Sequence, residues 1–191
     1  MENKKVVTIY MEANPNPNSL KFVFNFMLMP EGESLDYPDS AAAADSPLAQ
    51  ELFKLPYVGR VFFMSNFITI TKNTEQDWLE IREEIKEFLK GYFEKGGIIA
   101  HPKALEKPAV SENETEVVGK IKNILDEYIR PAVEQDGGAI QFHSFDEGKV
   151  KVLLQGSCSG CPSSTITLKA GIENLLKRMV PEVQEVVAEG V

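Results

Sequence analysis

The chain is poor in the residues that most often carry catalysis and metal binding. Its 191 residues include only two cysteines, two histidines and one tryptophan. Basic side chains are also scarce, with 20 against 29 acidic ones, which gives a formal net charge of −9. Such a charge argues against non-specific binding to nucleic acid or to an anionic membrane. No apolar run approaches the roughly 20 residues that a spanning helix needs. We therefore expect no nucleic acid and no membrane among the partners.

The small number of cysteines also bears on the cellular compartment. In a reducing compartment, two closely spaced cysteines are more often ligands or catalysts than a structural disulfide. The opening stretch, MENKKVVTIYMEAN, has the composition of a first strand. It has neither the apolar core of a signal peptide nor the Arg and Ser richness of a transit peptide. A cytoplasmic protein is the simplest expectation, although a processed organellar protein would have the same composition.

Two regions of regular periodicity flank one without any. The segment 94–113 contains two glycines, two prolines and several charges but no sustained period, which is typical of a flexible linker. We expect one domain over residues 1–93 and a second over 114–191. The expected fold class is α+β, with two small α/β-sandwich domains joined by this linker.

The first region has the pattern of a sheet followed by a long helix. Strands are expected at residues 6–11, 20–27, 58–64 and 67–71. The acidic segment 30–45 is expected to be a surface loop, and Ser46 to cap a short helix that begins at Pro47. Thr74 is expected to open the long helix, which Gly96 and the glycine after it end. One face of the second strand carries large side chains that we expect in the core: Leu20, Phe22, Phe24 and Phe26.

The second region has the order helix, strand, strand, helix, strand. A capping box at Asn113 and Glu116 begins the first helix, which Pro131 is expected to kink. Strands are expected at 139–145, 149–155 and 183–187, with a helix from Pro162 before the last one. The apolar stripe of that helix is Leu168, Ile172, Leu175, Leu176 and Met179. This order predicts an α-β-β-α-β sandwich with its helices on one face of a small sheet.

Both cysteines lie in one short stretch, GSCSGCPSS, at residues 156–164. Cys158 falls in the loop after a strand, and Cys161 falls at the start of a helix. The free N–H groups and the dipole of that first turn favour the thiolate, the form that ligates metals or attacks disulfides. Gly156 and Gly160 have no Cβ, so the backbone can approach a bulky inorganic group.

A single chain cannot complete a metal site from these cysteines. Zinc and iron–sulfur sites take about four ligands. His101 lies in the expected linker and His143 in an expected strand, and neither has a fixed spacing to the CxxC motif, so we interpret both as exposed surface residues. A symmetric dimer would bring two CxxC pairs to one cluster. Because each chain then holds only half of the ligands, such a site suits cluster transfer better than permanent storage.

The same residues carry a resemblance to a known family. The second region resembles the C-terminal domain of NifU, also called the Nfu domain, over about 75 residues. The matching motifs are DGG at 136–138, GKV at 148–150, LQGSCSGCPSS at 154–164, TLK at 167–169, GIE at 171–173 and PEV at 181–183. The first region is similar to the Nfu N-terminal domain, through NPNPNSLKF at 14–22 and LPYVG at 55–59.

The resemblance implies a homodimeric carrier of a 4Fe-4S cluster that is not an enzyme. Its ligands would be Cys158 and Cys161, its clients apo iron–sulfur proteins, and its cluster donor an upstream scaffold. A 2Fe-2S form is a further option. The sequence departs from the family at Ala139 and Ser157, neither of which ligates the cluster. The scaffold and ferredoxin-like domains of full NifU are absent, which favours a late-acting carrier.

Two other functions use a CxxC pair. A thioredoxin-like dithiol oxidoreductase also places CxxC at a helix start after a strand. Here, however, a hairpin precedes the motif, and the single tryptophan is Trp78, far from Cys158 in the sequence. A structural zinc that bridges a dimer is the third reading. The first region contains no catalytic constellation, so its expected roles are client choice or support of the dimer.

Overall fold

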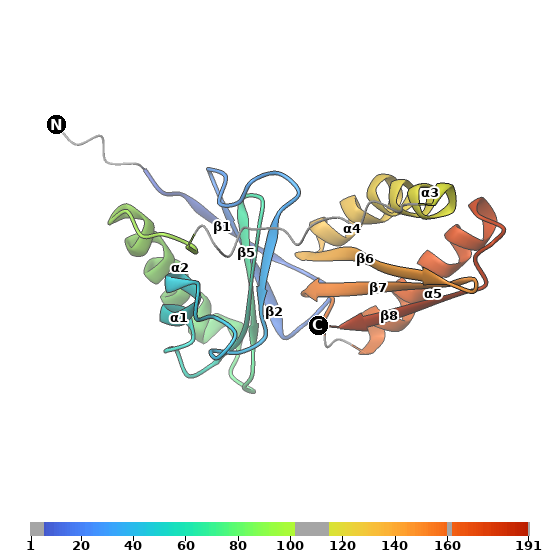
Figure 1. The fold of residues 1–191 in the computed structure, drawn as a ribbon. Coiled ribbons are helices and arrows are strands. Elements are labelled where there is room, and N and C mark those ends of the chain that lie inside the picture. The colour runs from blue at the N-terminus through green and yellow to red at the C-terminus, as the bar shows by residue number, and fades with distance from the viewer. Residues whose placement is uncertain (1–5, 102–114, 160–161, 191) are drawn as a thin grey trace. The chain divides into compact units, whose positions relative to one another are not determined.

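A computed structural model of the chain describes residues 6–101, 115–159 and 162–190. The chain divides into two compact units, residues 1–106 and 107–191, and each has its own hydrophobic core (Figure 1). The expected α+β class is confirmed, because both units combine helices with a sheet. Most of the expected linker, from 102 to 113, lies outside the described residues. Within the described residues, no helix has the length and apolar character to cross a membrane.

Unit 1 is a five-stranded antiparallel sheet covered by two helices. The sheet order is β1-β2-β5-β4-β3. In chain order the elements are β1 (Ile9–Ala13), β2 (Ser19–Phe24), β3 (Ser34–Tyr37), α1 (Pro47–Leu52), β4 (Val58–Met64), β5 (Phe67–Lys72) and α2 (Trp78–Glu94). Figure 1 shows α1 and α2 on the same face of the sheet.

The phenylalanine stripe of β2 lies in the core of unit 1, as predicted. Leu20, Phe22 and Phe24 are buried, and Phe26 packs partly buried against them. The ring of Phe24 meets that of Phe93 edge-on with centroids 5.1 Å apart, which joins the sheet to α2. The predicted hairpin is also present, with Ser65 in the left-handed region at φ 47° between β4 and β5.

The prediction of a loop over residues 30–45 is wrong in part, because β3 lies within it. The strand pairs with β4 and is fixed there by Arg60, whose Nε and Nη2 donate to the two carboxylate oxygens of Asp36 at 2.8 and 2.6 Å. The ring of Tyr37 packs edge-on against Phe63. The strand was not predicted because the segment is acidic and the strand is only four residues long. Its acidic residue, Asp36, is paired with Arg60 on the neighbouring strand.

Two boundaries in unit 1 differ from those predicted. The first strand begins at Ile9 instead of residue 6. The long helix begins at Trp78, and the side chain of Asp77 accepts a hydrogen bond from the Leu79 N–H at 2.9 Å, so Asp77 is the cap and Thr74 is not. The predicted cap of α1 is confirmed, because Ser46 Oγ accepts from the Ala49 N–H at 3.1 Å.

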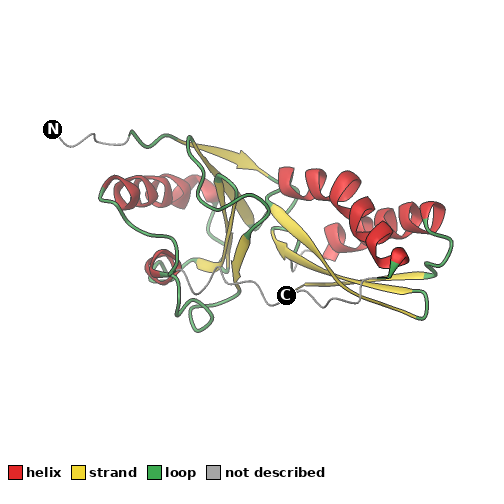
Figure 2. Ribbon diagram, turned by 45° about the horizontal axis from the view of Figure 1, so that its top comes forward, coloured by secondary structure: helices red, strands yellow, loops and turns green. Residues whose placement is uncertain are grey.

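Unit 2 has a three-stranded sheet whose helices pack on one face (Figure 2). Its first helical stretch has three parts, α3 (Glu116–Ile124), a π-helical turn at Leu125–Ile129, and α4 (Arg130–Gln135). The strands β6 (Gly138–Asp146) and β7 (Lys149–Gly156) form an antiparallel hairpin. The helix α5 (Pro162–Met179) follows, and β8 (Glu185–Gly190) then pairs in parallel with β7. The predicted α-β-β-α-β order is confirmed.

Local details of unit 2 refine the prediction. The cap of α3 is Thr115, which accepts from the Val118 N–H at 3.3 Å, whereas Asn113 lies outside the described residues. The π-helical turn ends at Ile129, two residues before Pro131, whose ring cannot fit a regular α-helical interior. At the end of α5, Met179 is 44% exposed and Val180 takes the buried position that the stripe assigned to Met179.

Candidate functional site

The cysteine loop connects the end of β7 to the start of α5. Gly156 ends β7 with φ at 64°, a left-handed conformation that favours glycine. The Ser159 N–H then donates to the Gly156 carbonyl at 3.1 Å and closes a turn around Cys158. The predicted placement of Cys158 after a strand is therefore correct. Cys161 lies outside the described residues, immediately before α5.

The Cys158 side chain is 6% exposed and belongs to the hydrophobic core of unit 2. Its sulfur lies 3.9 Å from the Ser157 hydroxyl, within the range of a weak sulfur hydrogen bond. Its carbonyl accepts from the Thr165 hydroxyl on α5 at 3.5 Å. The thiol is thus held at the edge of the core, between the loop that precedes it and the helix that follows.

Gly138, the first residue of β6, provides the space that the thiol occupies. A Cβ at this position would lie 2.8 Å from Cys158 Sγ and 2.7 Å from the Gln155 carbonyl oxygen. Atoms do not approach that closely, so only glycine fits without displacing the sulfur or the backbone of β7. A glycine pair after a helix is also typical of a helix stop. Gly137, at φ 80°, does serve that purpose, but Gly138 touches the site.

A second set of contacts ties the cysteine loop to the turn after α4. The Ser157 hydroxyl donates to the Asp136 carbonyl at 2.5 Å, and the Ser157 N–H donates to the Gly137 carbonyl at 3.3 Å. Ser157 is itself buried. Ser157 is therefore a structural contact between the cysteine loop and the turn after α4.

An acidic side chain fixes α5, the helix that begins at the cysteines, to the sheet. Glu173 accepts from Lys177 Nζ at 2.5 Å and from the Val186 N–H of β8 at 3.0 Å. The hydrogen bond from Lys177, and then that from Val186, holds the pKa of Glu173 below its ordinary value. The carboxylate form therefore links α5 to β8.

The described residues supply no further ligands in one place. Within them, no group of three or more His, Cys, Asp or Glu side chains is arranged to hold a metal ion. His101 is exposed in unit 1, and its N–H donates to the Asp45 carbonyl at 2.9 Å. His143 is exposed at a bulge in β6, with Nδ1 3.2 Å from the Ser144 hydroxyl. Both histidines are surface residues, as predicted.

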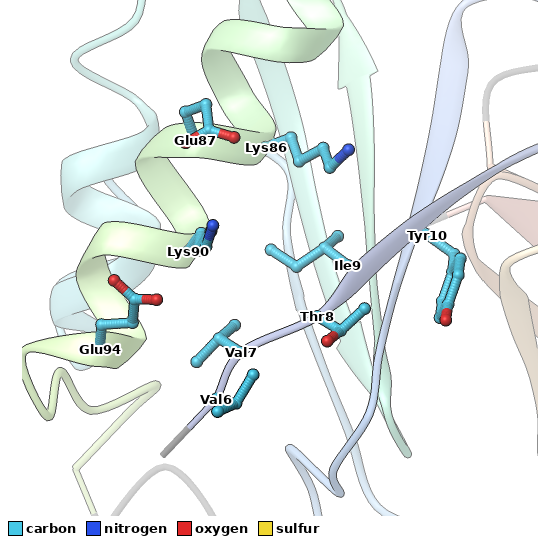
Figure 3. Close-up of a pocket in the computed structure, with 9 residues that line it drawn as sticks. All are labelled: Val6, Val7, Thr8, Ile9, Tyr10, Lys86, Glu87, Lys90 and Glu94. Atoms are coloured by element: carbon cyan, nitrogen blue, oxygen red, sulfur yellow. The ribbon is translucent and has the colours of Figure 1, made fainter. Parts of the chain in front are cut away.

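A hollow in unit 1 lies between the start of β1 and α2 (Figure 3). Lys86, Glu87, Lys90 and Glu94 border it on the helix, and residues 6–10 border it on the strand side. Figure 3 shows Lys86 reaching from the helix toward the strand that carries Ile9. Its lining has neither cysteine nor histidine, so it offers no soft-metal ligand, and we assign it no part in the cysteine chemistry.

Two protein families match this chain, one for each unit. The family described as "Scaffold protein Nfu/NifU N terminal" matches residues 9–96, and the NifU-like domain matches residues 121–187. The human protein named "NFU1 iron-sulfur cluster scaffold homolog, mitochondrial" is 44% identical over 179 residues, which cover 93% of this chain and 70% of the human one. This chain belongs to the Nfu family.

Other Nfu relatives have similar coverage. A Drosophila willistoni protein of the same name as the human one is 42% identical over 96% of this chain and 64% of its own length. The Arabidopsis thaliana protein named "NifU-like protein 4, mitochondrial" is 40% identical over 97% of this chain and 67% of its own. The Nfu chain thus spans about two thirds of the length of these relatives.

The names of these relatives correct one expectation. All three are called mitochondrial, which points to a mitochondrial and not a cytoplasmic location. The cytoplasmic expectation was wrong because it rested on composition. Two closely spaced cysteines are typical of a protein in a reducing compartment but do not distinguish one reducing compartment from another.

Proposed function

We propose that this Nfu protein binds an iron–sulfur cluster through Cys158 and Cys161 and transfers it to apo-proteins in mitochondria. The observation that carries the proposal is the position of the Cys158 thiol, which occupies space that any side chain at Gly138 would fill. Among the described residues, no group of three or more ligand side chains is arranged to hold a metal ion. Membership of a family whose relatives are named iron–sulfur cluster scaffolds supports the same reading. The protein is a carrier, and the cluster is its cargo.

Coordination chemistry argues for two copies of the chain per cluster. A 4Fe-4S cluster takes four thiolate ligands. One chain contains two cysteines in all. Two chains related by a two-fold axis supply four identical ligands, and the cluster then lies on that axis. The same four thiolates could instead hold a 2Fe-2S cluster. The iron content per two chains distinguishes the two cluster types.

Shared ligation makes release a sequence of ligand exchanges. Each cysteine thiol of the client loses its proton and binds iron as a thiolate. The displaced Cys158 or Cys161 thiolate takes up a proton, so that the exchange consumes no net protons and changes no oxidation state. Because each carrier chain holds only half of the ligands, separation of the two chains opens the cluster to the client. An upstream scaffold loads the carrier by the same exchange in reverse, and no catalytic group is required.

Anaerobic reconstitution with ferrous iron and sulfide tests this function. We expect broad absorption in the visible range, about four irons per two chains, and reconstitution of an apo 4Fe-4S enzyme when the loaded protein is added. C158A and C161A are expected to lose the iron, while S40A, which changes an exposed hydroxyl in unit 1, retains it. A reversible two-electron couple without iron would instead identify a dithiol oxidoreductase, and tight zinc binding with refusal of iron a structural zinc site.

A further inference from the structure

An apolar groove opens in unit 1 between the segment that follows β2 and the segment that follows α2. It has a volume of about 290 Å³ and is lined by residues 26–29, Phe93 and residues 97–100. None of these residues is charged. Met27 is 59% exposed and Ile98 is 50% exposed, so each wall presents a large apolar side chain to solvent. Exposed apolar side chains that gather in this way mark interaction sites on soluble proteins.

Aromatic rings connect the groove to the core of unit 1. The rings of Phe26 and Phe93 meet edge-on with centroids 5.5 Å apart, and both pack partly buried against the core. Leu28 and Ile99 are half-buried against the same core. An occupant of the groove therefore contacts side chains that the fold already holds in place, which reduces the entropy lost on binding.

The backbone of both groove walls already has hydrogen-bond partners within unit 1. The N–H groups of residues 28–29 donate to the Ser65 carbonyl at 2.7 and 2.9 Å. On the other wall, the carbonyls of residues 98–99 accept from the hydroxyls of Tyr92 and Ser46 at 2.8 and 2.5 Å. An added strand would find few backbone groups there to bond. Recognition through side chains, as when a helix lies in a groove, fits these walls better than strand addition.

The charge beside the groove is acidic. All charged residues from 22 to 53 are acidic, and Glu31 and Glu33 come directly after the first wall. Glu31 is exposed and makes no ion pair with the other described residues. At the end of α2, Glu94 and Lys95 are both exposed and offset each other. The net charge at the rim is therefore negative, which complements a basic partner.

We propose that the apolar groove binds an amphipathic helix of another protein, with its apolar face in the groove and basic residues near Glu31. The anchors are apolar side chains three and four residues apart on one face of that helix. Met27 and Met29 suit this role, because flexible and polarizable side chains adapt to different apolar partners. The inference goes beyond cluster transfer, since both cysteines lie in unit 2 and this binding needs no metal.

A fluorescent peptide of about 18 residues, roughly five helical turns, tests the groove. It contains leucine at i, i+3, i+4 and i+7 and lysine elsewhere, which gives one apolar face. We expect fluorescence anisotropy to show binding to the full wild-type chain. A peptide with glutamate in place of lysine, and a scrambled leucine–lysine peptide without an apolar face, should each bind at least tenfold more weakly. Equal binding of the scrambled peptide would show general attraction to an acidic protein and overturn the inference.

Substitutions in the groove are matched by substitutions at the other end of α2. M27S/I98S removes both exposed apolar side chains, and we expect peptide affinity to fall about tenfold or more. L79S removes an apolar side chain that is 66% exposed at the start of α2 and should bind as the wild type does. E31K is expected to weaken binding about threefold, with an effect that shrinks as salt is raised. E75K, which changes an exposed carboxylate just before α2, should have a smaller effect.

The remaining controls separate folding and other occupants from the proposed helix. Because the replaced side chains are exposed, the variants should keep the wild-type circular dichroism and melting temperature. Unchanged peptide affinity in folded M27S/I98S would overturn the inference. So would binding to neutral phosphatidylcholine vesicles, or dimers of the iron-free chain, that this variant loses, since the groove would then serve a membrane or a second copy. C158A should bind the peptide as the wild type does, so failure of this inference and failure of iron loading are distinguishable.

Discussion

At the scale of single residues, the space around the Cys158 sulfur depends on a missing methyl group. Gly138 begins β6, and its register partner on β7 is Gly156, which precedes the cysteine by two residues. A Cβ at Gly138 would meet the sulfur at 2.8 Å and the Gln155 carbonyl oxygen at 2.7 Å. The oxygen belongs to the backbone of a paired strand and cannot move aside easily. A Cβ at this position therefore displaces the sulfur and also strains the backbone where β6 and β7 pair.

G138A tests this contact. We expect overpacking to lower the free energy of unfolding by about 1–3 kcal/mol. Because the thiol is displaced from its position, we also expect a changed rate of Cys158 alkylation and at least a partial loss of bound iron. Denaturant unfolding and timed alkylation followed by mass spectrometry provide the measurements.

G119A is the matched control for this variant. Gly119 lies in α3, and a Cβ there would have nothing within 4 Å. Replacing a helical glycine by alanine stabilises by about 0.5–1 kcal/mol, and iron loading should be unchanged. Wild-type stability and alkylation kinetics in G138A would contradict the steric role of Gly138.

Sequence reasoning identified the two cysteines but could not decide between two roles for this glycine, a contact of the site or a helix stop. The CxxC pair is recognisable because both cysteines lie within four consecutive residues of the sequence. The contact of Gly138 with Cys158 joins residues twenty positions apart, and it exists only because β6 and β7 pair in one register. A glycine pair after a helix is explained equally well by the left-handed turn at Gly137. The strand register distinguishes the two roles.

At the scale of secondary-structure elements, Glu173 joins α5 to β8 and makes this junction sensitive to pH. The pKa of Glu173 is lowered in the folded chain by the hydrogen bond from Lys177 and then by that from the Val186 N–H. A carboxyl group with a lowered folded pKa stabilises the fold above its unfolded pKa, and this contribution is lost as the pH falls through the folded value. The window lies around and below the ordinary value of 4.5.

E173Q should therefore reduce stability most near neutral pH. We expect the difference in unfolding free energy between wild type and E173Q to be constant from pH 7 to about pH 5 and to shrink as the pH falls further. Urea unfolding at a series of pH values measures the difference. E127Q, which removes an exposed carboxylate on the π-helical turn, is the matched control substitution. A difference that stays constant to pH 3 would show that the carboxylate charge does not link the two elements.

In unit 1, Ser46 has two roles at the start of α1. Its hydroxyl accepts from the Ala49 N–H at 3.1 Å and donates to the Ile99 carbonyl at 2.5 Å. The side chain thus caps the helix and also holds residues that follow α2. S46A removes both hydrogen bonds in a buried position.

We expect S46A to lower the unfolding free energy by about 1–3 kcal/mol, since a cap is lost and a carbonyl oxygen loses its donor. Thermal unfolding of the full chain measures the change. The exposed Ser40 supplies the matched control, with a change within about 0.5 kcal/mol in S40A. Equal melting temperatures for S46A and S40A would contradict the double role of Ser46.

Elements with strong periodicity were predicted well, and short or irregular ones were not. The hairpin of β4 and β5, the helix α1 and the order of unit 2 follow from alternation, capping and turn residues. The strand β3 is only four residues long, and its acidic Asp36 is explained by Arg60 on the neighbouring strand. The π-helical turn before Pro131 was predicted only as a kink, because the sequence indicates where a helix is disturbed but not how its hydrogen bonds rearrange.

At the scale of the whole molecule, the chain consists of two units with separate cores. Unit 2 contains the cysteines, and the described part of unit 1 contains no metal-ligand cluster. Both cysteines of the sequence lie in its C-terminal half, at residues 158 and 161. The sequence did not predict the cellular compartment, because amino-acid composition does not determine where a protein is located. Relatives named as mitochondrial supplied that correction.

The account depends most on the number of chains that hold one cluster. The direct measurement is native mass spectrometry of the wild-type protein after anaerobic reconstitution with iron and sulfide. We predict a species of two chains with about four irons and four sulfides, and single chains once the cluster is removed by a chelator. A single chain that carries a complete cluster, or a wild-type protein with free thiols that takes up no iron, would contradict the account.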